Sequence, residues 1–375
     1  MPPRSAYIHV PFCAHRCGYC NFTLVTGRDD LIADYLRSIE RELEGLGEPH
    51  EVDTLYFGGG TPTHLPPASL DRLLSLVKRW FPPAPGYELS VEANPADVTA
   101  ERVAVLAAHG VTRVTLGAQS FRTEKLRLLE RDHDGDDIRR AFDLCRRFPS
   151  VGLDLIFAAP GETLAQWQAD LSAALALRPD HVSTYGLTIE KGTTFYGRWQ
   201  RGGLQKADEE LERAMYAMAI DRLTAAGLEH YEVSNFDRPG HRCRHNDVYW
   251  MGGQYFGIGP GAARHIDGRR EINHRSTTTY LQRVLSGQSP TAESEQLSPA
   301  DAAREVFVFA MRRLDGVSRR WFKEQTGLDL DILVGKPLLR FTELKLLTDD
   351  GETVRLTREG LFLSDSLWPE FLADG

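Results

Sequence analysis

The sequence predicts an α/β fold, a partial (β/α)6 barrel followed by a small C-terminal winged-helix-like domain. The first observation is size, because 375 residues with 42% hydrophobic and 26% charged residues suit one large α/β domain and a smaller one. The second is a rhythm of six strand–helix alternations over residues 7–187, which indicates parallel strands with right-handed crossovers. The third is a change of character near residue 297, where a helix-rich segment begins.

The six predicted strands of the barrel are short, mostly apolar runs. They cover residues 7–10, 52–57, 87–92, 111–117, 151–157 and 181–187. Helices with an apolar face are expected between them, at residues 32–43, 70–77, 103–109, 123–130, 136–146 and 167–177. Asp29 or Asp30 is placed to cap the first helix. In such barrels the functional residues lie at the carboxyl ends of the strands.

Three further segments are expected before residue 297. A long helix covers residues 208–226, and a strand covers 230–236. A glycine-rich run at 255–262 predicts a strand and turn that return to the barrel. The resulting domain bounds are 1–235 for the barrel and 236–296 for an extension of it.

Residues 297–375 form the predicted C-terminal domain. Its helices are expected at 300–314, 318–325 and 337–347, and a two-stranded wing is expected at 346–348 and 353–356. Winged-helix domains often bind DNA, but the candidate recognition helix here is mostly apolar. We therefore expect this domain to dock or cover something rather than to read DNA.

Three cysteines follow the first strand with the spacing C-x3-C-x2-C, namely Cys13, Cys17 and Cys20. Three thiols this close do not make a set of disulfides, and thiolate is a soft ligand that selects zinc, copper(I) or iron–sulfur clusters. Structural zinc takes four protein ligands, so His9, His15 or another residue would have to supply the fourth. A [4Fe–4S] cluster held by three cysteines leaves one iron able to hold a cofactor. The spacing favours the cluster over a zinc site or three unrelated loop cysteines.

A glycine-rich turn, Gly-Gly-Gly-Thr-Pro-Thr at residues 58–63, follows the second strand. It lacks the Lys-Ser/Thr of a P-loop and the later glycine of a dinucleotide fingerprint. Glycines here let the backbone approach a polar ligand and present its hydrogen-bonding groups to it. The alternative is a tight strand-to-helix turn with no ligand.

The cysteine spacing at the end of the first strand resembles that of the radical S-adenosylmethionine (SAM) enzymes. With further motifs, the chain resembles the oxygen-independent coproporphyrinogen III oxidase family nearly end to end. Those motifs are YIHVPFC with the following CNF, LYFGGGTPT, SVEANP, LGAQSF, LERDH, LDLIFAAPGET and HNDVYW. The resemblance implies a partial TIM-like radical SAM barrel with a [4Fe–4S] cluster, SAM and a small C-terminal domain.

The resemblance also implies roles for individual residues. The cluster ligands would be Cys13, Cys17 and Cys20. Contacts to the cluster-bound SAM would come from Tyr7, Tyr19, Gly59 and Glu92. A second site, which holds another SAM in the oxidase branch, would be lined by Gly60, Thr61, Gln119, Arg131 and Asp154. Residues 158–163, Ala-Ala-Pro-Gly-Glu-Thr, depart from the family's usual Gly-Leu-Pro-Gly-Gln-Thr, which bears on the backbone contacts of that second site.

Three side chains of this set have a chemistry that suits the implied ligands. Glu92 and Asp154 are acceptors for an ammonium group or for ribose hydroxyls. Arg131 is a donor fork for a carboxylate, on SAM or on a porphyrin propionate. The alternative for each is a salt bridge at a strand end.

Two features point to one branch of the family. The oxidase branch has a further cysteine two residues after the third, and here that position is Phe22. The run His-Asn-Asp-Val-Tyr-Trp at 245–250 resembles the HNxxYW motif of the other branch, the heme chaperones of HemW type. Imidazole is a natural axial ligand of heme iron, which suggests His245, while Tyr249 and Trp250 offer flat surfaces to a porphyrin. Cys243 is a second candidate ligand, and a hydrogen-bonded structural histidine is the alternative.

These features predict a heme chaperone that binds heme, a [4Fe–4S] cluster and SAM, and that delivers heme to apo-haemoproteins. The rival is an enzyme that decarboxylates two propionates of coproporphyrinogen III, and a third possibility is a zinc-stabilised barrel without redox chemistry. The net charge of −9 argues against a broad nucleic-acid-binding face. The chain begins without a signal peptide, contains no apolar run that could span a bilayer and clusters three of five cysteines, so a cytoplasmic protein is expected. Whether it forms a homodimer is left open.

Overall fold

A computed structural model describes residues 2–373. The predicted domain bounds also include residues 1 and 374–375, which lie outside the described residues. Its main feature is a nine-stranded sheet with the order β11-β1-β4-β5-β6-β7-β8-β10-β9. The parallel strands of this sheet that the barrel prediction concerns are β1 (Ser5–Val10), β4 (Val52–Gly59), β5 (Pro83–Ala93), β6 (Arg113–Gln119), β7 (Ser150–Phe157) and β8 (His181–Gly186). The predicted partial (β/α)6 barrel is thereby confirmed.

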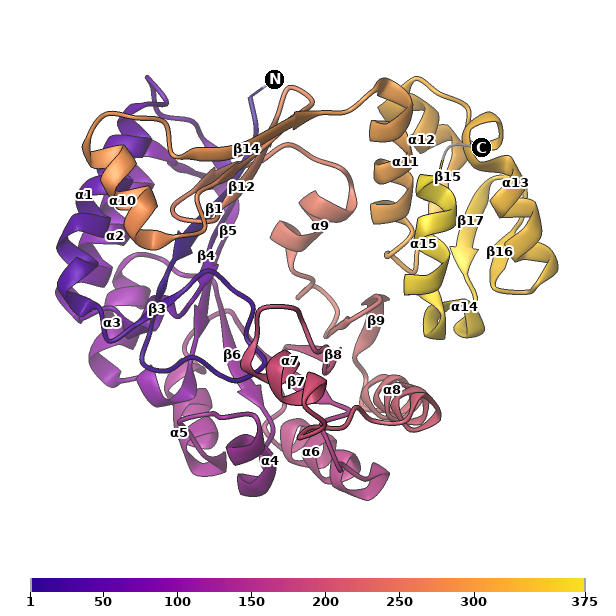
Figure 1. The fold of residues 1–375 in the computed structure, drawn as a ribbon, viewed down its shortest axis with the longest axis horizontal. Coiled ribbons are helices and arrows are strands. Elements are labelled where there is room, and N and C mark those ends of the chain that lie inside the picture. The colour runs from indigo at the N-terminus through magenta and orange to yellow at the C-terminus, as the bar shows by residue number, and fades with distance from the viewer. Residues whose placement is uncertain (1, 374–375) are drawn as a thin grey trace.

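Helices cover the outer face of this curved sheet (Figure 1). They are α1 (Ile32–Glu44), α2 (Pro67–Trp80), α3 (Ala100–Ala108), α4 (Thr123–Leu128), α5 (Gly135–Cys145), α6 (Leu164–Ala176) and α8 (Glu209–Ala225). The predicted apolar face of α1 is buried, as Leu36 and Leu43 illustrate. The capping prediction was wrong, because Asp29 and Asp30 lie in a 3-10 turn (Asp29–Leu31) and no side chain caps α1.

Both edges of the barrel are extended by later segments. At one edge β11 (Phe256–Ile258) pairs in parallel with β1, with Ile8 opposite Ile258, so the glycine-rich run returns to the barrel as predicted. At Gly257 a Cβ atom would lie 1.8 Å from the carbonyl oxygen of Ala263, so only glycine fits there. At the other edge β10 (Asn235–Asp237) pairs antiparallel with β8 and with β9 (Glu229–Glu232). The single strand predicted at 230–236 is therefore two strands.

The fourth barrel strand lies two residues later than predicted. The ladder of β6 with β5 begins at Arg113, opposite Ser90. Thr112 still belongs to the connection before the strand, where its backbone N–H donates to the carbonyl of Leu89 at 3.0 Å. As a consequence Gln119 is the last residue of the strand rather than a residue beyond it.

Residues 244–250 form a helix that the sequence analysis did not predict, α9 (Arg244–Trp250). The carboxylate of Glu88, in β5, accepts the backbone N–H groups of Arg244 at 2.9 Å and His245 at 3.1 Å. These are two of the N–H groups that a helix leaves without an internal partner, and an anion there also suits the helix dipole. The capping residue lies far away in the sequence, which is why local pattern did not indicate a helix.

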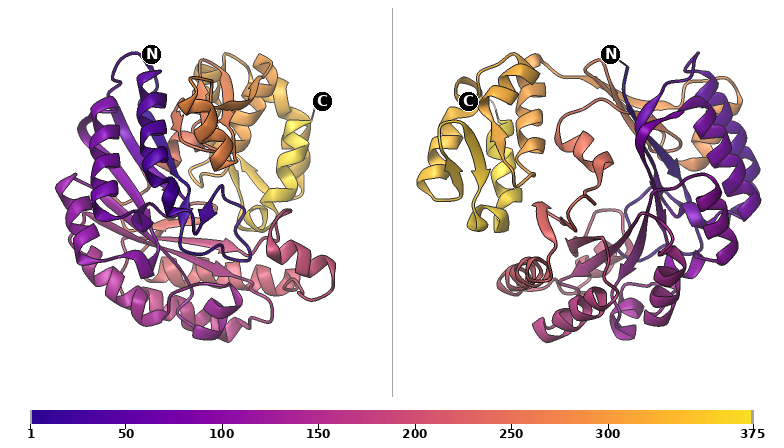
Figure 2. Two further views of the ribbon diagram at one scale, coloured as in Figure 1. Left: turned by 60° about the vertical axis from the view of Figure 1, so that its left-hand side comes forward. Right: turned by 180° about the vertical axis from the view of Figure 1, so that it is seen from behind.

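A small antiparallel sheet follows, which the sequence did not predict. It consists of β12 (Ala263–Ile266), β13 (Arg269–Asn273) and β14 (Thr291–Gln296). α10 (Thr277–Leu285) connects the last two strands and packs on α1. In Figures 1 and 2, α9 stands between the barrel sheet and the C-terminal domain.

The C-terminal domain has its own apolar core, which includes Phe307, Phe322, Phe341 and Phe371. Its elements are α11 (Pro299–Ala310), β15 (Val317–Ser318), α12 (Arg319–Thr326), α13 (Leu330–Glu343), β16 (Leu347–Asp349), β17 (Thr353–Leu356), α14 (Arg358–Phe362) and α15 (Ser364–Leu372). The order up to β17 is that of a winged helix, with β16 and β17 as the wing.

One helix of this domain starts earlier than predicted. Pro337 was expected near the start of the helix but lies inside α13, which carries a non-helical residue at Val334. The division at residues 235 and 296 remains a prediction. Among the residues that the structure describes, no helix is both long and apolar enough to cross a membrane.

Candidate cluster and cofactor site

A cavity of about 360 Å³ opens at the carboxyl ends of the barrel strands. The predicted site residues that line it are Cys13, Cys17, Tyr19, Cys20, Gly59, Gly60, Thr61, Glu92, Gln119, Arg131 and Asp154. Segments from all six parallel strands or from the loops after them thus meet at one place. Four predicted residues, Tyr7, His245, Tyr249 and Trp250, do not line this cavity.

The cysteine loop is held at both ends. β2 (Phe12–Cys13) pairs with β3 (Val25–Thr26), and the backbone N–H of Val25 donates to the carbonyl of Pro11 at 2.7 Å. Cys13 Sγ lies 3.2 Å from Thr61 Oγ1, and Arg131 Nη1 lies 3.5 Å from Cys17 Sγ. The loop therefore presents all three half-buried thiols to the cavity.

The donor set fits an iron–sulfur cluster better than a single ion. In the described part of the chain, no three His, Cys, Asp or Glu side chains come close enough together to hold one metal ion. A cluster of four irons needs its cysteine ligands farther apart than one zinc ion does. Burial raises the pKa of the Cys13 thiol to about 12, so without metal it is a protonated thiol, and cluster binding must displace the proton.

The glycine turn packs directly against the cysteine loop. The backbone N–H of Gly60 donates to the carbonyl of Val10, and that of Thr61 donates to the carbonyl of Phe12, both at 2.8 Å. Gly59 has a φ of +108°, and a Cβ atom there would lie 2.4 Å from the ring of His9. Glycine is thus required at position 59 because two loops approach each other closely. This reason holds whether the turn binds a polar ligand or is only a tight strand-to-helix turn.

Glu92 is fixed in place without a positive partner. Its carboxylate accepts from Tyr56 Oη at 2.8 Å and from the backbone N–H of Gly59 at 3.1 Å. Burial raises the pKa of Glu92 to about 7 and that of Asp154 to about 6. Neither carboxyl group forms an ion pair with any of residues 2–373, so both are available to a cationic or hydroxyl-bearing ligand.

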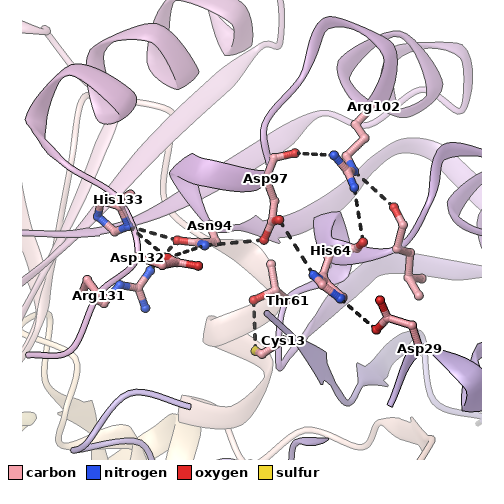
Figure 3. Close-up of polar contacts among 11 residues, drawn as sticks. Cys13, Asp29, Thr61, His64, Asn94, Asp97, Arg102, Arg131, Asp132 and His133 are labelled. Atoms are coloured by element: carbon pink, nitrogen blue, oxygen red, sulfur yellow. Dashed lines mark hydrogen bonds and ion pairs between the residues drawn. The ribbon is translucent and has the colours of Figure 1, made fainter. Parts of the chain in front are cut away.

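Arg131 is also oriented by neutral groups rather than by an acid. Its Nη2 donates to Asn94 Oδ1 at 2.7 Å (Figure 3). The same nitrogen donates to the carbonyl of Gly117 at 3.0 Å. Its Nε is buried and has no hydrogen-bond partner within the described residues. Gln119 has a φ of +63°, which is unusual for a residue with a side chain and is typical of functional sites. A guanidinium that no acid pairs with, beside two carboxyl groups that have no ion-pair partner among the described residues, fits a zwitterionic ligand.

Sequence reasoning missed the residues that position this set. Asn94 lies two residues after Glu92 in the motif SVEANP. Its Oδ1 accepts from Arg131 and lies 3.1 Å from His133 Nδ1, while its Nδ2 donates to Asp132 Oδ1 at 3.0 Å (Figure 3). Hydrogen bonds from His133 and Asn94 hold the pKa of Asp132 well below its usual range. The signal was available, because these residues lie in the same motifs as Glu92 and Arg131. Tyr56, which orients Glu92, was also missed, although it lies in the motif LYFGGGTPT.

A second network of hydrogen bonds and ion pairs holds the segment that follows the glycine turn (Figure 3). His64 Nε2 lies 3.0 Å from Asp29 Oδ1, and its Nδ1 lies 3.8 Å from Asp97 Oδ1. Hydrogen bonding to Asp97 and Asp29 raises the pKa of His64. Arg102 donates to the backbone carbonyls of His64, Leu65 and Asp97. The segments after β4 and β5 are thus held together around the cavity.

The motif residue His245 lies in α9 and does not line the cluster cavity. Its Nδ1 is 3.1 Å from Ser5 Oγ and 3.0 Å from Thr54 Oγ1, and its Nε2 is 2.8 Å from Tyr249 Oη. Burial lowers the pKa of His245 to about 3, and its ring stacks on Tyr56 at 5.0 Å. Only 1% of the residue is exposed. Both ring nitrogens are engaged, so binding an iron would require His245 to give up one of these hydrogen bonds.

The other heme candidates divide into two groups. Cys243 is buried, with its Sγ 3.7 Å from Glu88 Oε1, so it is no more accessible than His245. Tyr7, which was predicted as a SAM contact and not as a heme contact, does not line the cluster cavity, and its hydroxyl lies 3.1 Å from His9 Nδ1. Tyr249 and Trp250 line a second cavity next to the C-terminal domain. Their roles, and that of His245 as an axial ligand, remain predictions.

At residues 158–163, where the sequence departs from the family's usual motif, the structure has a buried ion-pair network. Glu162, where the family usually has glutamine, pairs with Lys125 Nζ, which also lies 3.2 Å from Asp170 Oδ2. The three side chains are at most 2% exposed. Glu162 also accepts the backbone N–H of Ala159 at 3.0 Å. A buried lysine thus compensates the charge of Glu162.

Comparison with known proteins agrees with this geometry. Residues 7–174 match the Radical SAM superfamily, and residues 297–363 match the HemN C-terminal domain. The chain is 33% identical to heme chaperone HemW of Bacillus subtilis, over 99% of this chain and 100% of that protein. It is also 33% identical to heme chaperone HemW of Escherichia coli, over 100% of this chain and 99% of that protein.

The fold has a close counterpart among solved structures. Coproporphyrinogen III oxidase HemN of Escherichia coli, described as a radical SAM enzyme, superposes with a TM-score of 0.86 over 99% of this chain and 90% of that chain. Its sequence identity of 23% limits this likeness to the fold. Membership of the radical SAM group implies SAM and a [4Fe–4S] cluster, in agreement with the cavity. By its full-length identity to curated relatives, the chain belongs to the HemW family of radical SAM proteins.

Proposed function

We propose that this protein is a heme chaperone, which binds heme and transfers it to apo-haemoproteins. The observation that carries the proposal is the combination of an intact cluster cavity with a phenylalanine at position 22. Phe22 lines that cavity and is 65% exposed, at the position where the oxidase branch has a cysteine. The relatives named heme chaperones, which match the whole chain, support the same choice.

The cluster cavity would hold the [4Fe–4S] cluster on Cys13, Cys17 and Cys20. When bound and reduced, such a cluster would supply an electron for SAM chemistry. Glu92 would accept the ammonium group of SAM, and the turn at Gly59 would present backbone groups to it. Tyr19 and the more distant Tyr7 would complete that site.

A second set of contacts would come from other residues that line the same cavity. Arg131, with its free Nε, would donate to a carboxylate, and Asp154 would accept from hydroxyl groups. Gly60, Thr61 and Gln119 would complete this set, as the sequence resemblance implies. Whether the ligand here is a second SAM or a propionate-bearing molecule depends on which branch chemistry the chain retains.

The second candidate function is oxidative decarboxylation of coproporphyrinogen III. The intact set of Glu92, Arg131 and Asp154 keeps this candidate open, because these groups would suit SAM and a propionate. Phe22 argues against it, since an apolar ring cannot replace a thiol in acid–base or hydrogen-atom chemistry.

We further propose a cytoplasmic location, because three unpaired cysteines in one loop need a reducing compartment. Heme and apo-haemoproteins are the proposed partners, nucleic acid is not one, and homodimer formation is an open part of the proposal.

The function is tested by heme titration beside a turnover assay. Purified protein is expected to bind one heme per chain whether or not its cluster has been reconstituted, because heme is the cargo and the cluster site is separate. It is expected not to convert coproporphyrinogen III in the presence of SAM and a reductant. Robust conversion would contradict the proposal and move the protein to the oxidase branch.

Glu92 gives a test of the SAM site. Glu92→Ala is expected to leave the cluster intact and to weaken SAM binding by roughly tenfold or more, because a charge-assisted hydrogen bond contributes about 1.5–3 kcal/mol. The raised pKa of about 7 adds a pH dependence. Below this pH the carboxyl is protonated and does not attract an ammonium group, so wild-type affinity should be about tenfold lower at pH 6 than at pH 8.

Glu92→Gln is the matched control, because it keeps the shape of the side chain without its titration. Calorimetric titration with SAM should give a flat pH profile for this variant, apart from any titration of SAM itself. Equal SAM affinity in wild type and Glu92→Ala would mean that Glu92 is only a structural acid at a strand end.

A further inference from the structure

A second cavity, of about 290 Å³, lies between α9, the small sheet and α11 of the C-terminal domain. Five of its lining residues have rings, namely Tyr249, Trp250, Tyr255, His265 and Phe309. The Tyr249 and Tyr255 rings meet edge to face with centroids 4.7 Å apart. A half-open cavity with flat aromatic walls suits a planar, largely apolar ligand.

His265 is the only histidine that the described residues place on this cavity. It lies in β12, where backbone hydrogen bonds in both directions with Tyr255, each of 3.0 Å, fix its position. Its Nδ1 lies 3.3 Å from the carbonyl oxygen of Gly253 and therefore carries the proton. Its Nε2 has no hydrogen-bond partner among residues 2–373. A backbone carbonyl behind Nδ1 is the usual second partner of a histidine that binds a metal through Nε2.

Trp250 supplies an independent observation. Its indole Nε1 is buried and has no acceptor within the described part of the chain. The guanidinium of Arg312 lies over the indole ring at 4.6 Å and holds it in place. A ring that is fixed in this way offers a rigid flat wall, which suits a planar ligand.

The charged residues at this cavity do not attract the ligand by themselves. Arg270 is paired with Glu305 and with Glu295, so its charge is compensated. Affinity must then come from the rings, from Trp250 and from a bond between iron and His265. His245 contributes to this cavity only indirectly, through its 2.8 Å contact with Tyr249 Oη.

We propose that heme binds in this second cavity, with His265 as the axial ligand of its iron and with Tyr249, Trp250, Tyr255 and Phe309 around the porphyrin. The inference rests on the proposed function, because it takes heme as the ligand. It assigns the tyrosine and tryptophan of the HNDVYW motif to the cavity wall and its histidine to the support of that wall. α11 forms one side of the cavity, so the C-terminal domain would cover part of the bound heme.

The test titrates hemin into the full-length protein and follows the Soret band and the dissociation constant. His265→Ala is expected to shift the Soret band and to weaken hemin binding at least about tenfold, since even an outer partner of a metal ligand contributes about 10- to 100-fold. Added imidazole should restore the wild-type band in this variant, because it replaces the missing ligand. Iron-free protoporphyrin should bind wild type and His265→Ala with similar, weaker affinity.

Two further variants complete the design. Ala302→Trp, on α11, fills the cavity without touching His265 and should also weaken hemin binding. His109→Ala is the control, because His109 lies on the barrel surface beside Asp71 and should leave hemin binding unchanged. Wild-type-like hemin binding by both His265→Ala and Ala302→Trp would overturn the inference while the chaperone function stands. Failure of the wild type to bind hemin would overturn the proposed function itself.

Discussion

Anaerobically reconstituted Cys17→Ser protein is expected to contain no [4Fe–4S] cluster, whereas the wild type holds about four iron and about four labile sulfide ions per chain. The three cysteines of the loop all line one cavity, and the remaining two cannot substitute. Cys145 is buried in α5, and Cys243 is buried next to Glu88. Iron and sulfide analysis and the absorbance at roughly 400 nm measure the effect.

Cys145→Ser provides the matched control, because it removes a buried thiol away from the cavity. It should retain the full iron and sulfide content. A wild-type protein that carries one zinc and no sulfide would contradict the cluster assignment, as would a Cys17→Ser variant that keeps its cluster.

Lys125→Met is expected to destabilise the barrel by about 3–5 kcal/mol, because it leaves two buried carboxylates without their cation. Asp170 is completely buried and also accepts from Ser120 Oγ at 2.7 Å and from the backbone N–H of Phe121 at 2.8 Å. These neutral donors cannot replace the charge. Denaturant-induced unfolding measures the change in the free energy of unfolding. The buried Trp167 is a local fluorescence probe, with its ring 5.1 Å from Lys125 Nζ.

Glu162→Gln is the corresponding control. It introduces the residue that the family usually has and removes one of the two acids that share the lysine, so it should cost about 1 kcal/mol or less. A Lys125→Met variant as stable as Glu162→Gln would show that the buried ion pairs do not contribute to stability.

The chemistry of the cluster site could be predicted from the sequence because its residues lie in short local motifs. Parallel strands place their carboxyl ends at one edge of a sheet, so residues after each strand converge. Cys13, Gly59, Glu92 and Arg131 follow this rule, and the cavity contains all four. The prediction needed only the strand rhythm and the identity of the residues that follow each strand.

Features that depend on distant partners could not be predicted in this way. α9 begins where Glu88, more than 150 positions earlier, accepts its first N–H groups. The burial of His245 arises because Ser5, Thr54 and Tyr249 surround its ring, and none of these contacts has a local signature. Likewise, the sequence around Glu162 does not show that its partner is Lys125, which lies in α4, 37 positions earlier.

The position of β1 in the sheet has a consequence for how the chain folds during synthesis. β1 pairs with β4 on one side and with β11 on the other, where Ile8 lies opposite Phe57 and Ile258. One edge of β1 therefore stays without its partner until residue 258 has left the ribosome. An open strand edge can pair with other chains, so nascent molecules are exposed to aggregation during this interval. The cysteine loop begins directly after β1, and we therefore expect cluster insertion to follow completion of the sheet rather than emergence of the cysteines.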